Sequence, residues 1–315
     1  MDERGKQPLL ILAGATAVGK TEISLAIARE LNGEVISCDS GQVFRGLDIG
    51  TAKISMKDRG EIPHYGIDIA DPRQTFSVAD YQHYAREAIS QIAGHGRLPI
   101  VVGGTGLWIR ALIQNYVFSP QDPQISRILR QHIRMIGDEH GWDIVRQILS
   151  TVDPASYARI APRDYNRLTR ALEVFWSTGK PLPRNGQDSP YRVSYWVLTR
   201  PMAELRERIR VRVQEMMFRG LPKEVLGLLQ QGIDRYSQAL SAIGYKETAD
   251  WAYGLATAEE RDSLIIRHTR QYAKRQLTWF RSEKAARWLD LSLVDPQRVI
   301  RLIVQDVHEH LLMPS

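Results

Sequence analysis

Short apolar runs alternate with helix-like stretches in the first third of the chain. Bounded by Gly, Pro or Asp, these runs are typical of strands buried on both faces of a parallel sheet. They cover residues 9–13, 34–38, 66–69 and 99–102. Between them, residues 21–31 and 78–93 place apolar side chains three and four positions apart, as helices do. Strands that alternate with helices predict an α/β fold with a parallel sheet flanked by helices.

The alternation stops after about residue 115. The chain then reads as helical pieces separated by turns that contain Pro. These pieces cover residues 124–136, 142–150 and 166–177. A further buried strand follows at residues 194–198, and the chain is helical again after it. We therefore predict an α/β core of residues 1–115 and 195–315, interrupted by an all-helical insertion of residues 116–194.

Basic side chains are unevenly distributed along the chain. Its 315 residues include 42 Lys and Arg against 36 Asp and Glu, a net charge of +6. Residues 261–288 hold eight basic and two acidic side chains, so the remaining 287 residues balance at 34 against 34. A local basic excess of this kind predicts a polyanionic partner.

Two further features bound the class of protein. Cys38 is the single cysteine, which excludes an intramolecular disulfide and fits a reducing compartment. No run of about 18 apolar residues is present, so we expect no membrane span. The sequence is that expected of a cytoplasmic protein.

The first predicted strand leads into a phosphate-binding motif. Residues 14–21 match G-x-x-x-x-G-K-[ST] at every fixed position, between a strand and a helix. Gly14 and Gly19 permit a backbone path that turns N–H groups toward phosphate oxygens, Lys20 adds a positive charge, and the Thr21 hydroxyl would hold Mg²⁺. We expect the whole loop to bind a diphosphate or triphosphate: Gly14, Ala15, Thr16, Ala17, Val18, Gly19, Lys20 and Thr21.

The motif does not by itself predict phosphoryl transfer or hydrolysis. A kinase or ATPase of this class has an acidic metal partner at the end of a second strand. The strand at residues 99–102 ends instead in Gly103-Gly104-Thr105-Gly106, which has no carboxylate. A carboxylate appears at Asp39, after the strand at residues 34–38.

The basic segment has the pattern of a nucleic-acid surface. Arg267, Arg270, Lys274 and Arg281 share one helix face, with the aromatic residues Tyr272, Trp279 and Phe280 interleaved. The charges would follow phosphates, and an aromatic ring could stack on an unpaired base. The alternative is that Tyr272, Leu277 and Phe280 are core residues and the basic face is merely solvated.

An ordered series of motifs resembles the tRNA dimethylallyltransferases, also called tRNA isopentenyltransferases, over nearly the whole chain. Besides the phosphate loop, the motifs are residues 39–44, 50–53, 63–68, 76–78, 103–108, 166–173, 242–247 and 270–276. Each motif alone is a weak signal, whereas the ordered set is specific. This chain departs from the family at Phe44 and Trp108, where Tyr is usual, and at Gly41, where a larger residue is common.

The resemblance implies a P-loop α/β fold and transfer of the dimethylallyl group from dimethylallyl diphosphate to N6 of the adenosine 3′ to the anticodon, with release of pyrophosphate. Adenine N6 is a poor nucleophile because its lone pair is delocalised, so a base should help, and Asp39 is the candidate. The alternative is that Asp39 serves only as a ligand to Mg²⁺. By resemblance, Thr105 orients the same amine.

The leaving diphosphate would be held by the phosphate loop, Lys20 and Mg²⁺. Arg208 and Arg212 lie four positions apart on one helix face and would clamp the pyrophosphate from the other side. The alternative is a solvated, salt-bridged helix face, because Glu204, Glu207 and Glu215 stand among them.

The resemblance also implies that a monomer contacts the anticodon stem-loop of tRNA, with the helical insertion around the stem. The expected tRNA-binding residues are Asp39, Ser40, Gly41, Gln42, Thr105, Asn166, Arg167, Leu168, Thr169, Arg170, Gly244, Tyr245, Lys246, Arg270, Lys274, Arg275 and Arg281. The target adenosine must leave its stack, which a single-stranded loop makes easy.

Three other functions fit part of the pattern. An adenylate isopentenyltransferase acting on free AMP, ADP or ATP shares the loop and the base but has less use for a separate basic helix. A small-molecule kinase would consume the γ-phosphate of ATP. An RNA-binding NTPase would hydrolyse ATP and leave tRNA unmodified.

Overall fold

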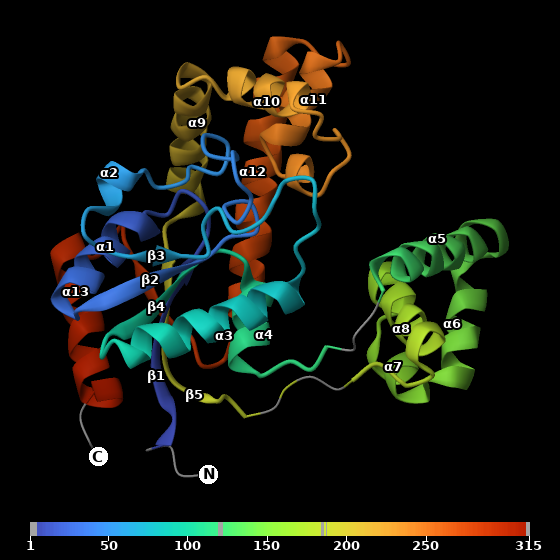
Figure 1. Cartoon of the computed structure of the whole chain (residues 1–315), viewed down its shortest axis with the longest axis horizontal. Helices are drawn as coiled ribbons and strands as arrows, with labels where there is room; N and C mark the ends of the chain where they lie inside the picture. Colours follow the sequence, from blue (N-terminus) through green and yellow to red (C-terminus); the bar gives the residue numbers. More distant parts are fainter. Residues whose placement is uncertain (1–4, 119–121, 184–185, 187, 313–315) are drawn as a thin grey trace. The chain divides into compact units, whose positions relative to one another are not determined.

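The computed structural model describes residues 5–118, 122–183, 186 and 188–312 (Figure 1). The chain forms two compact units, each described here by itself. An α/β unit combines Met1–Gln114 with Asp188–Ser315, and a helical unit comprises Asn115–Gln187. The helical unit ends earlier than the predicted insertion of residues 116–194, because the fifth strand already begins at Tyr191. None of the helices in the described residues combines the length and the apolar character needed to cross a bilayer.

The α/β unit is built on a six-stranded parallel sheet with the order β3-β2-β4-β1-β5-β6. The strands are β1 (Gln7–Gly14), β2 (Gly33–Cys38), β3 (His64–Tyr65), β4 (Leu98–Gly103), β5 (Tyr191–Thr199) and β6 (Arg287–Asp290). The central strand β1 is buried almost throughout, as its apolar run requires. The predicted α/β class with a parallel sheet is confirmed.

Two strands differ from the prediction. The third strand is His64–Tyr65 rather than residues 66–69, because Gly66 and Asp68 have φ values of +76° and +58°, which break an extended path. Strand β6 was not predicted. It pairs with β5 at the edge of the sheet, and two of its four residues are exposed, so it shows no buried apolar run.

Helices cover both faces of the sheet (Figure 1). Helices α1 (Lys20–Glu30) and α13 (Pro296–Val307) pack together on one face, whereas α3 (Val78–Gly94) and α4 (Gly106–Ile113) pack together on the other. This arrangement follows from right-handed crossovers in a sheet whose strand order reverses after β3. A short helix, α2 (Met56–Arg59), precedes β3.

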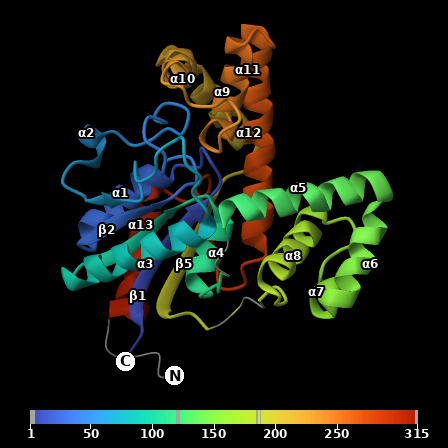
Figure 2. The ribbon, with the colours of Figure 1, turned by 45° about the vertical axis from the view of Figure 1, so that its right-hand side comes forward.

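The chain after β5 forms a set of helices that stands beside the carboxyl edge of the sheet. They are α9 (Met202–Phe218), α10 (Leu221–Gln230), the 3₁₀ turn Ala239–Ser241, α11 (Tyr245–Ala252) and α12 (Ala258–Arg281). Helices α9 and α12 lie side by side, and α12 also contacts β1 and α4 (Figure 2). A capping box between Thr257 and Glu260 starts α12. A π-helical turn, His308–Leu312, follows α13.

The helical unit contains α5 (Pro123–His140), α6 (Trp142–Val152), α7 (Pro154–Arg159) and α8 (Tyr165–Thr178). Its own apolar core includes Ile133, Val145, Leu149, Leu168 and Leu172. The pieces predicted at residues 124–136, 142–150 and 166–177 correspond to α5, α6 and α8. Helix α7 was not predicted, because six residues are too few to show a helical apolar period.

Candidate active site in the α/β unit

The ends of three neighbouring strands bring the candidate residues together. Strand β1 leads into the phosphate loop, β2 ends directly before Asp39, and β4 ends directly before Gly104 and Thr105. The register places Gly103 opposite both Ala13 and Cys38. Because all three strands are parallel, their carboxyl ends share one edge of the sheet, where α/β proteins bind ligands.

The phosphate loop has the backbone that its glycines predict. Gly14 and Gly19 have φ values of +153° and +108°, and a Cβ on Gly14 would lie 2.5 Å from the carbonyl oxygen of Leu198. Helix α1 begins at Lys20 without a side-chain cap, so its first N–H groups remain available to an anion. The Lys20 Nζ donates to the carbonyl oxygens of Gly14 and Ala15, at 3.0 and 2.9 Å.

Two half-buried cations share the cavity that adjoins this loop. Burial, with a further contribution from the positive charge of Arg212, lowers the pKa of Lys20 to about 8. Burial also lowers the pKa of Arg212. The Arg212 Nε atom is buried and has no hydrogen-bond partner among the described residues. Two desolvated cations and an unpaired N–H donor form a site for a small anion.

Arg208 reaches across to the phosphate loop from α9. Its Nε donates to the carbonyl oxygen of Ala17 at 2.7 Å. The neighbouring acids pair elsewhere: Glu204 with Arg200 and Glu207 with Arg210. The hydrogen bond from Arg208 to Ala17 therefore favours a position against the loop over a salt-bridged helix face.

Asp39 is held in one orientation by the chain that follows it. Its Oδ1 accepts from the N–H groups of Gly41 and Gln42, at 2.9 and 3.3 Å. Its Oδ2 accepts no hydrogen bond from the described residues, and Asp39 lines the cavity. The Thr105 Oγ1 accepts from the Ser40 N–H at 3.2 Å, which keeps this hydroxyl beside Asp39.

Tyr272 of α12 completes this corner. Burial and the negative charge of Asp39 raise the pKa of Tyr272 above its usual value, and Tyr272 lines the cavity. Cys38 is adjacent, but burial raises its pKa to about 12, so it stays a protonated thiol at neutral pH.

The cavity has a volume of about 950 Å³ and is lined entirely by the α/β unit. Its polar side comprises the phosphate loop, Asp39 to Gln42, Arg208 and Arg212. Apolar side chains from separate elements line the remainder, among them Ile54, Ile67, Met216, Ile243 and Ile265. A group with a charged end and an apolar end fits such a lining.

Gln276 is a cavity residue that residue-type reasoning did not select. It lies on α12, is buried, and joins two loops at the carboxyl edge of the sheet. Its Oε1 accepts from the Thr16 N–H, and its Nε2 donates to the carbonyl oxygen of Gly104, both at 2.9 Å. The one available signal was its position at the end of the motif of residues 270–276.

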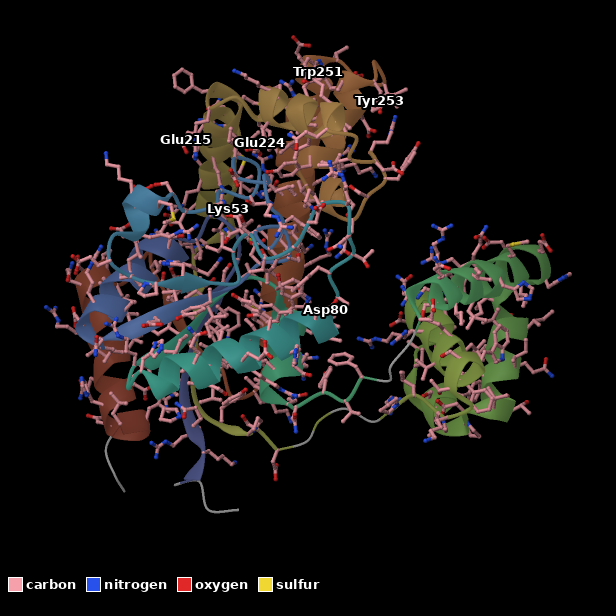
Figure 3. All side chains as sticks on the ribbon, in the orientation of Figure 1. Lys53, Asp80, Glu215, Glu224, Trp251 and Tyr253 are labelled. Atoms are coloured by element: carbon pink, nitrogen blue, oxygen red, sulfur yellow. The ribbon has the colours of Figure 1, made fainter. Side chains whose placement is uncertain are left out.

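The loop that follows Asp39 is fixed by two charged groups, the buried Lys53 and the half-buried Glu224 (Figure 3). The Lys53 Nζ contacts one carboxylate oxygen each of Asp48 and Asp68 at 2.6 Å. Glu224 accepts from the backbone N–H groups of Ile49 and Gly50 and from the Tyr245 hydroxyl. These contacts hold the wall of the cavity in place.

Tyr245 was expected to contact tRNA, but its side chain is fully buried. Its ring packs so closely on Gly50 that a Cβ there would lie 2.4 Å from the ring. The expectation is therefore wrong for the Tyr245 side chain, because the ring is core. Gly244 is buried too, whereas Lys246 is exposed.

The other expected tRNA-binding residues divide between the two units. In the helical unit, Leu168 and Thr169 are buried, which removes their side chains from an RNA surface. Asn166 and Arg167 are exposed, and Arg170 pairs with the buried Glu173 at 2.5 Å.

On α12 the outer face is charged. Lys274, Arg275 and Arg281 are exposed, whereas Arg270 is half-buried. The interior positions Leu277 and Phe280 are buried, as the alternative interpretation of this helix expected. Tyr272 lines the cavity instead of facing the basic surface.

The three departures from the family pattern are accommodated differently. Phe44 is buried in the core and Trp108 stacks on Tyr81, with ring centroids 4.4 Å apart, so both act as apolar packing groups. Gly41 lines the cavity, and a Cβ there would lie 2.8 Å from the Thr51 side chain. A larger residue at position 41 would require Thr51 to move.

Comparisons with known proteins agree on one family. Residues 42–283 match the family described as IPP transferase. A tRNA dimethylallyltransferase of Symbiobacterium thermophilum is 44% identical over 91% of this chain and 90% of its own length. A tRNA isopentenylpyrophosphate transferase from Bacillus halodurans is 41% identical, covers 97% of both chains and has a TM-score of 0.74.

A eukaryotic dimethylallyltransferase acting on tRNA is 26% identical to this chain and has a TM-score of 0.79, covering 96% of this chain and 80% of its own. The similarity thus covers both the phosphate loop and the helices α9 and α12, which also line the cavity. The chain belongs to the IPP transferase family.

Proposed function

We propose that this protein transfers the dimethylallyl group of dimethylallyl diphosphate to N6 of the adenosine 3′ to the anticodon of tRNA. The products are N6-isopentenyladenosine in tRNA and pyrophosphate. The observation that carries the proposal is one cavity lined by the desolvated cations Lys20 and Arg212, the second with an unpaired Nε, together with Asp39, whose neighbour Ser40 donates to the Thr105 hydroxyl. Such a cavity suits a small anionic donor on one side and a nucleophile on the other.

The diphosphate lies in the loop of Gly14 to Thr21. Backbone N–H groups, the amino end of α1 and Lys20 bind its oxygens, while Arg212 donates from its unpaired Nε and Arg208 closes the loop. These groups stabilise the negative charge that develops on the leaving pyrophosphate as the carbon–oxygen bond breaks.

The adenine amine attacks the same carbon. The N6–carbon bond forms as the carbon–oxygen bond breaks, and the Asp39 carboxylate accepts the proton that N6 loses. Its Oδ1 is held by two backbone N–H groups, so Oδ2 is the oxygen available to this proton. Thr105 orients the amine, and its own hydroxyl is positioned by Ser40.

Mg²⁺ is the expected cofactor. The Thr21 hydroxyl and the Asp39 carboxylate are hard oxygen donors that line the same cavity, which is the donor chemistry that Mg²⁺ prefers. Among the described residues no cluster of three or more His, Cys, Asp or Glu could hold a metal alone, so diphosphate oxygens would complete the ligands. When bound, the ion neutralises part of the diphosphate charge.

The anticodon stem-loop is the expected macromolecular partner. The exposed Lys274, Arg275 and Arg281 on α12 would contact its phosphates, and exposed residues of the segment Asn166–Arg170 in the helical unit would do the same. Asp39, Ser40, Gly41 and Gln42 line the cavity that would receive the target base. Because tRNA and its modification are cytoplasmic, the protein would act there. We also expect it to act as a monomer.

The similar proteins favour this function over a free-nucleotide transferase or a kinase, because all three are named as enzymes that act on tRNA. The test supplies the protein and Mg²⁺ with dimethylallyl diphosphate and either unmodified tRNA, AMP or ATP, and follows the products by mass spectrometry. We expect prenylated tRNA. Prenylated AMP alone, or ADP formation alone, would overturn the proposal.

A further inference from the structure

Gln276 accepts a hydrogen bond from one of the backbone N–H groups of the phosphate loop. Its Oε1 accepts the Thr16 N–H at 2.9 Å, and the side chain is 6% exposed. The amide is fixed at its other end by the Gly104 carbonyl oxygen, also at 2.9 Å. Gly104 leaves the space that this requires, because a Cβ there would lie 2.1 Å from the Gln276 Nε2.

Because of this hydrogen bond, only some of the N–H groups of the loop remain free to bind an anion. The N–H groups nearest to α1, up to Lys20 and Thr21, remain available to phosphate oxygens. The Thr16 N–H, at the other end of the loop, is already satisfied by a neutral acceptor. A phosphate oxygen could bind there only by displacing a buried side chain that makes two hydrogen bonds.

The Gln276 amide also lies close to the residues that would face the adenine nucleophile. Gly104, which Gln276 holds, directly precedes Thr105, and the Thr105 hydroxyl contacts Ser40 next to Asp39. Gln276 therefore stands between the phosphate loop and the residues that face the nucleophile. The group to be transferred must lie on the side of the bound diphosphate that faces Gln276, Thr105 and Asp39, because the nucleophile attacks from there.

The chemistry of the transferred group decides which donors it needs. A prenyl group accepts no hydrogen bonds, so it loses nothing when the Thr16 N–H is occupied. The third phosphoryl group of a triphosphate carries charged oxygens, and it would lose a donor and meet the amide instead.

We propose that Gln276 makes the phosphate loop selective for a diphosphate whose transferred group is apolar, and disfavours triphosphates. The proposal rests on the proposed function, because it concerns the same loop and donor. It identifies a specificity-determining residue at a loop whose sequence motif alone permits either a diphosphate or a triphosphate.

The experiment measures the dissociation constants of inorganic pyrophosphate and inorganic tripolyphosphate by calorimetry, with Mg²⁺ present and the full chain. In the wild-type protein we expect pyrophosphate to bind more tightly than tripolyphosphate. In Gln276→Ala, the freed Thr16 N–H should strengthen tripolyphosphate binding. The ratio of the tripolyphosphate dissociation constant to the pyrophosphate dissociation constant should therefore fall by about tenfold, the effect of one charge-assisted hydrogen bond.

Three further variants separate selectivity from structural support. Gln276→Asn is too short to make both hydrogen bonds and should lower the ratio in the same direction, with less loss of packing. Gln276→Glu keeps an acceptor for Thr16 but cannot donate to Gly104, so the ratio should stay at least as high as in the wild type. Gln271→Ala makes the same truncation at an exposed position of α12 and should leave the ratio unchanged.

An unchanged ratio in folded Gln276→Ala and Gln276→Asn overturns the selectivity proposal, including the case in which both anions bind more weakly by the same factor. A lowered ratio in Gln276→Glu also overturns it, because the bridge to Gly104 would then be what matters. Wild-type protein that prenylates tRNA while the ratio stays fixed refutes only this proposal. Wild-type protein that fails to prenylate tRNA refutes the proposed function itself.

Discussion

The two faces of α12 differ in how many charged side chains they carry. Five residues of α12 line the cavity, and four of them, Ile265, Thr269, Tyr272 and Gln276, are uncharged, while the fifth is the exposed Arg275. The two desolvated cations of that cavity, Lys20 and Arg212, come from other elements. The outer face carries exposed Arg and Lys side chains.

The difference shows how one helix can serve two anions of different size. Cations partly desolvated inside a cavity act at short range and are screened less by water, which suits a small ligand held in one geometry. Exposed cations are screened by salt and bind by releasing counterions, which suits a long polyanion. Net charge therefore indicates the RNA surface of this protein and says little about the cavity.

The largest expected effect is at the base. Asp39→Asn keeps an oxygen for the N–H groups of Gly41 and Gln42 but cannot accept the amine proton, so turnover should fall by about 100- to 10,000-fold. The measurement is single-turnover prenylation of tRNA, with tRNA affinity from filter binding. Affinity should stay near the wild-type value, and Asp58→Asn on the exposed α2 serves as the matched control. Full activity in Asp39→Asn would remove Asp39 from the base role.

A smaller effect is expected where the cavity cation is removed. Arg212→Met should weaken pyrophosphate binding by about 10- to 100-fold, because it deletes a charged donor that faces the anion. Calorimetry measures the change. Arg210→Met, on the same helix and paired with Glu207 at the surface, should leave binding unchanged. Equal losses in both variants would contradict the assignment of Arg212.

The pKa of Lys20 predicts that the affinity for pyrophosphate depends on pH. Free Lys20 is protonated below its pKa of about 8 and neutral above it, and a bound diphosphate favours the protonated form. Affinity for pyrophosphate should therefore be full below pH 8 and fall by at most about tenfold per pH unit as pH rises above it. Titrations between pH 7 and pH 10 test this, and Lys20→Arg, which stays charged, should flatten the profile. A flat wild-type profile would disprove the titration of Lys20.

The smallest effect is expected on the outer face. Lys274→Ala should weaken tRNA binding a few-fold and reduce the slope of log affinity against log salt by about 0.7 to 0.9, the value for one phosphate contact. Pyrophosphate binding should not change. Arg301→Ala, at an exposed position of α13, provides the control. An unaltered salt slope in Lys274→Ala would support the solvated-face interpretation.

Local patterns predicted most of the sheet and the phosphate loop. Strands β1, β2, β4 and β5 are apolar and buried, and the loop motif specifies its own backbone path, so sequence alone indicates them. Strand β6 and helix α7 escaped prediction because a short edge strand and a six-residue helix have no distinctive period.

Residues whose role depends on distant contacts could not be predicted in the same way. Gln276 reads as one more polar position on a basic helix, and only its contacts with Thr16 and Gly104 reveal its place in the cavity. Tyr245 was expected to contact tRNA, yet its hydroxyl accepts from the N–H of Gly50, 195 residues away, and donates to Glu224.

The order of the elements along the chain has a consequence for synthesis on the ribosome. The phosphate loop is made before the helical unit, whereas Arg208, Arg212 and Gln276 follow only after it. A nascent chain that ends before α9 therefore carries an anion-binding loop that lacks its covering cations and its Gln276 amide. Glu224 is likewise made after the helical unit, so the wall formed by Ile49 and Gly50 can reach its final form only once α10 has been synthesised.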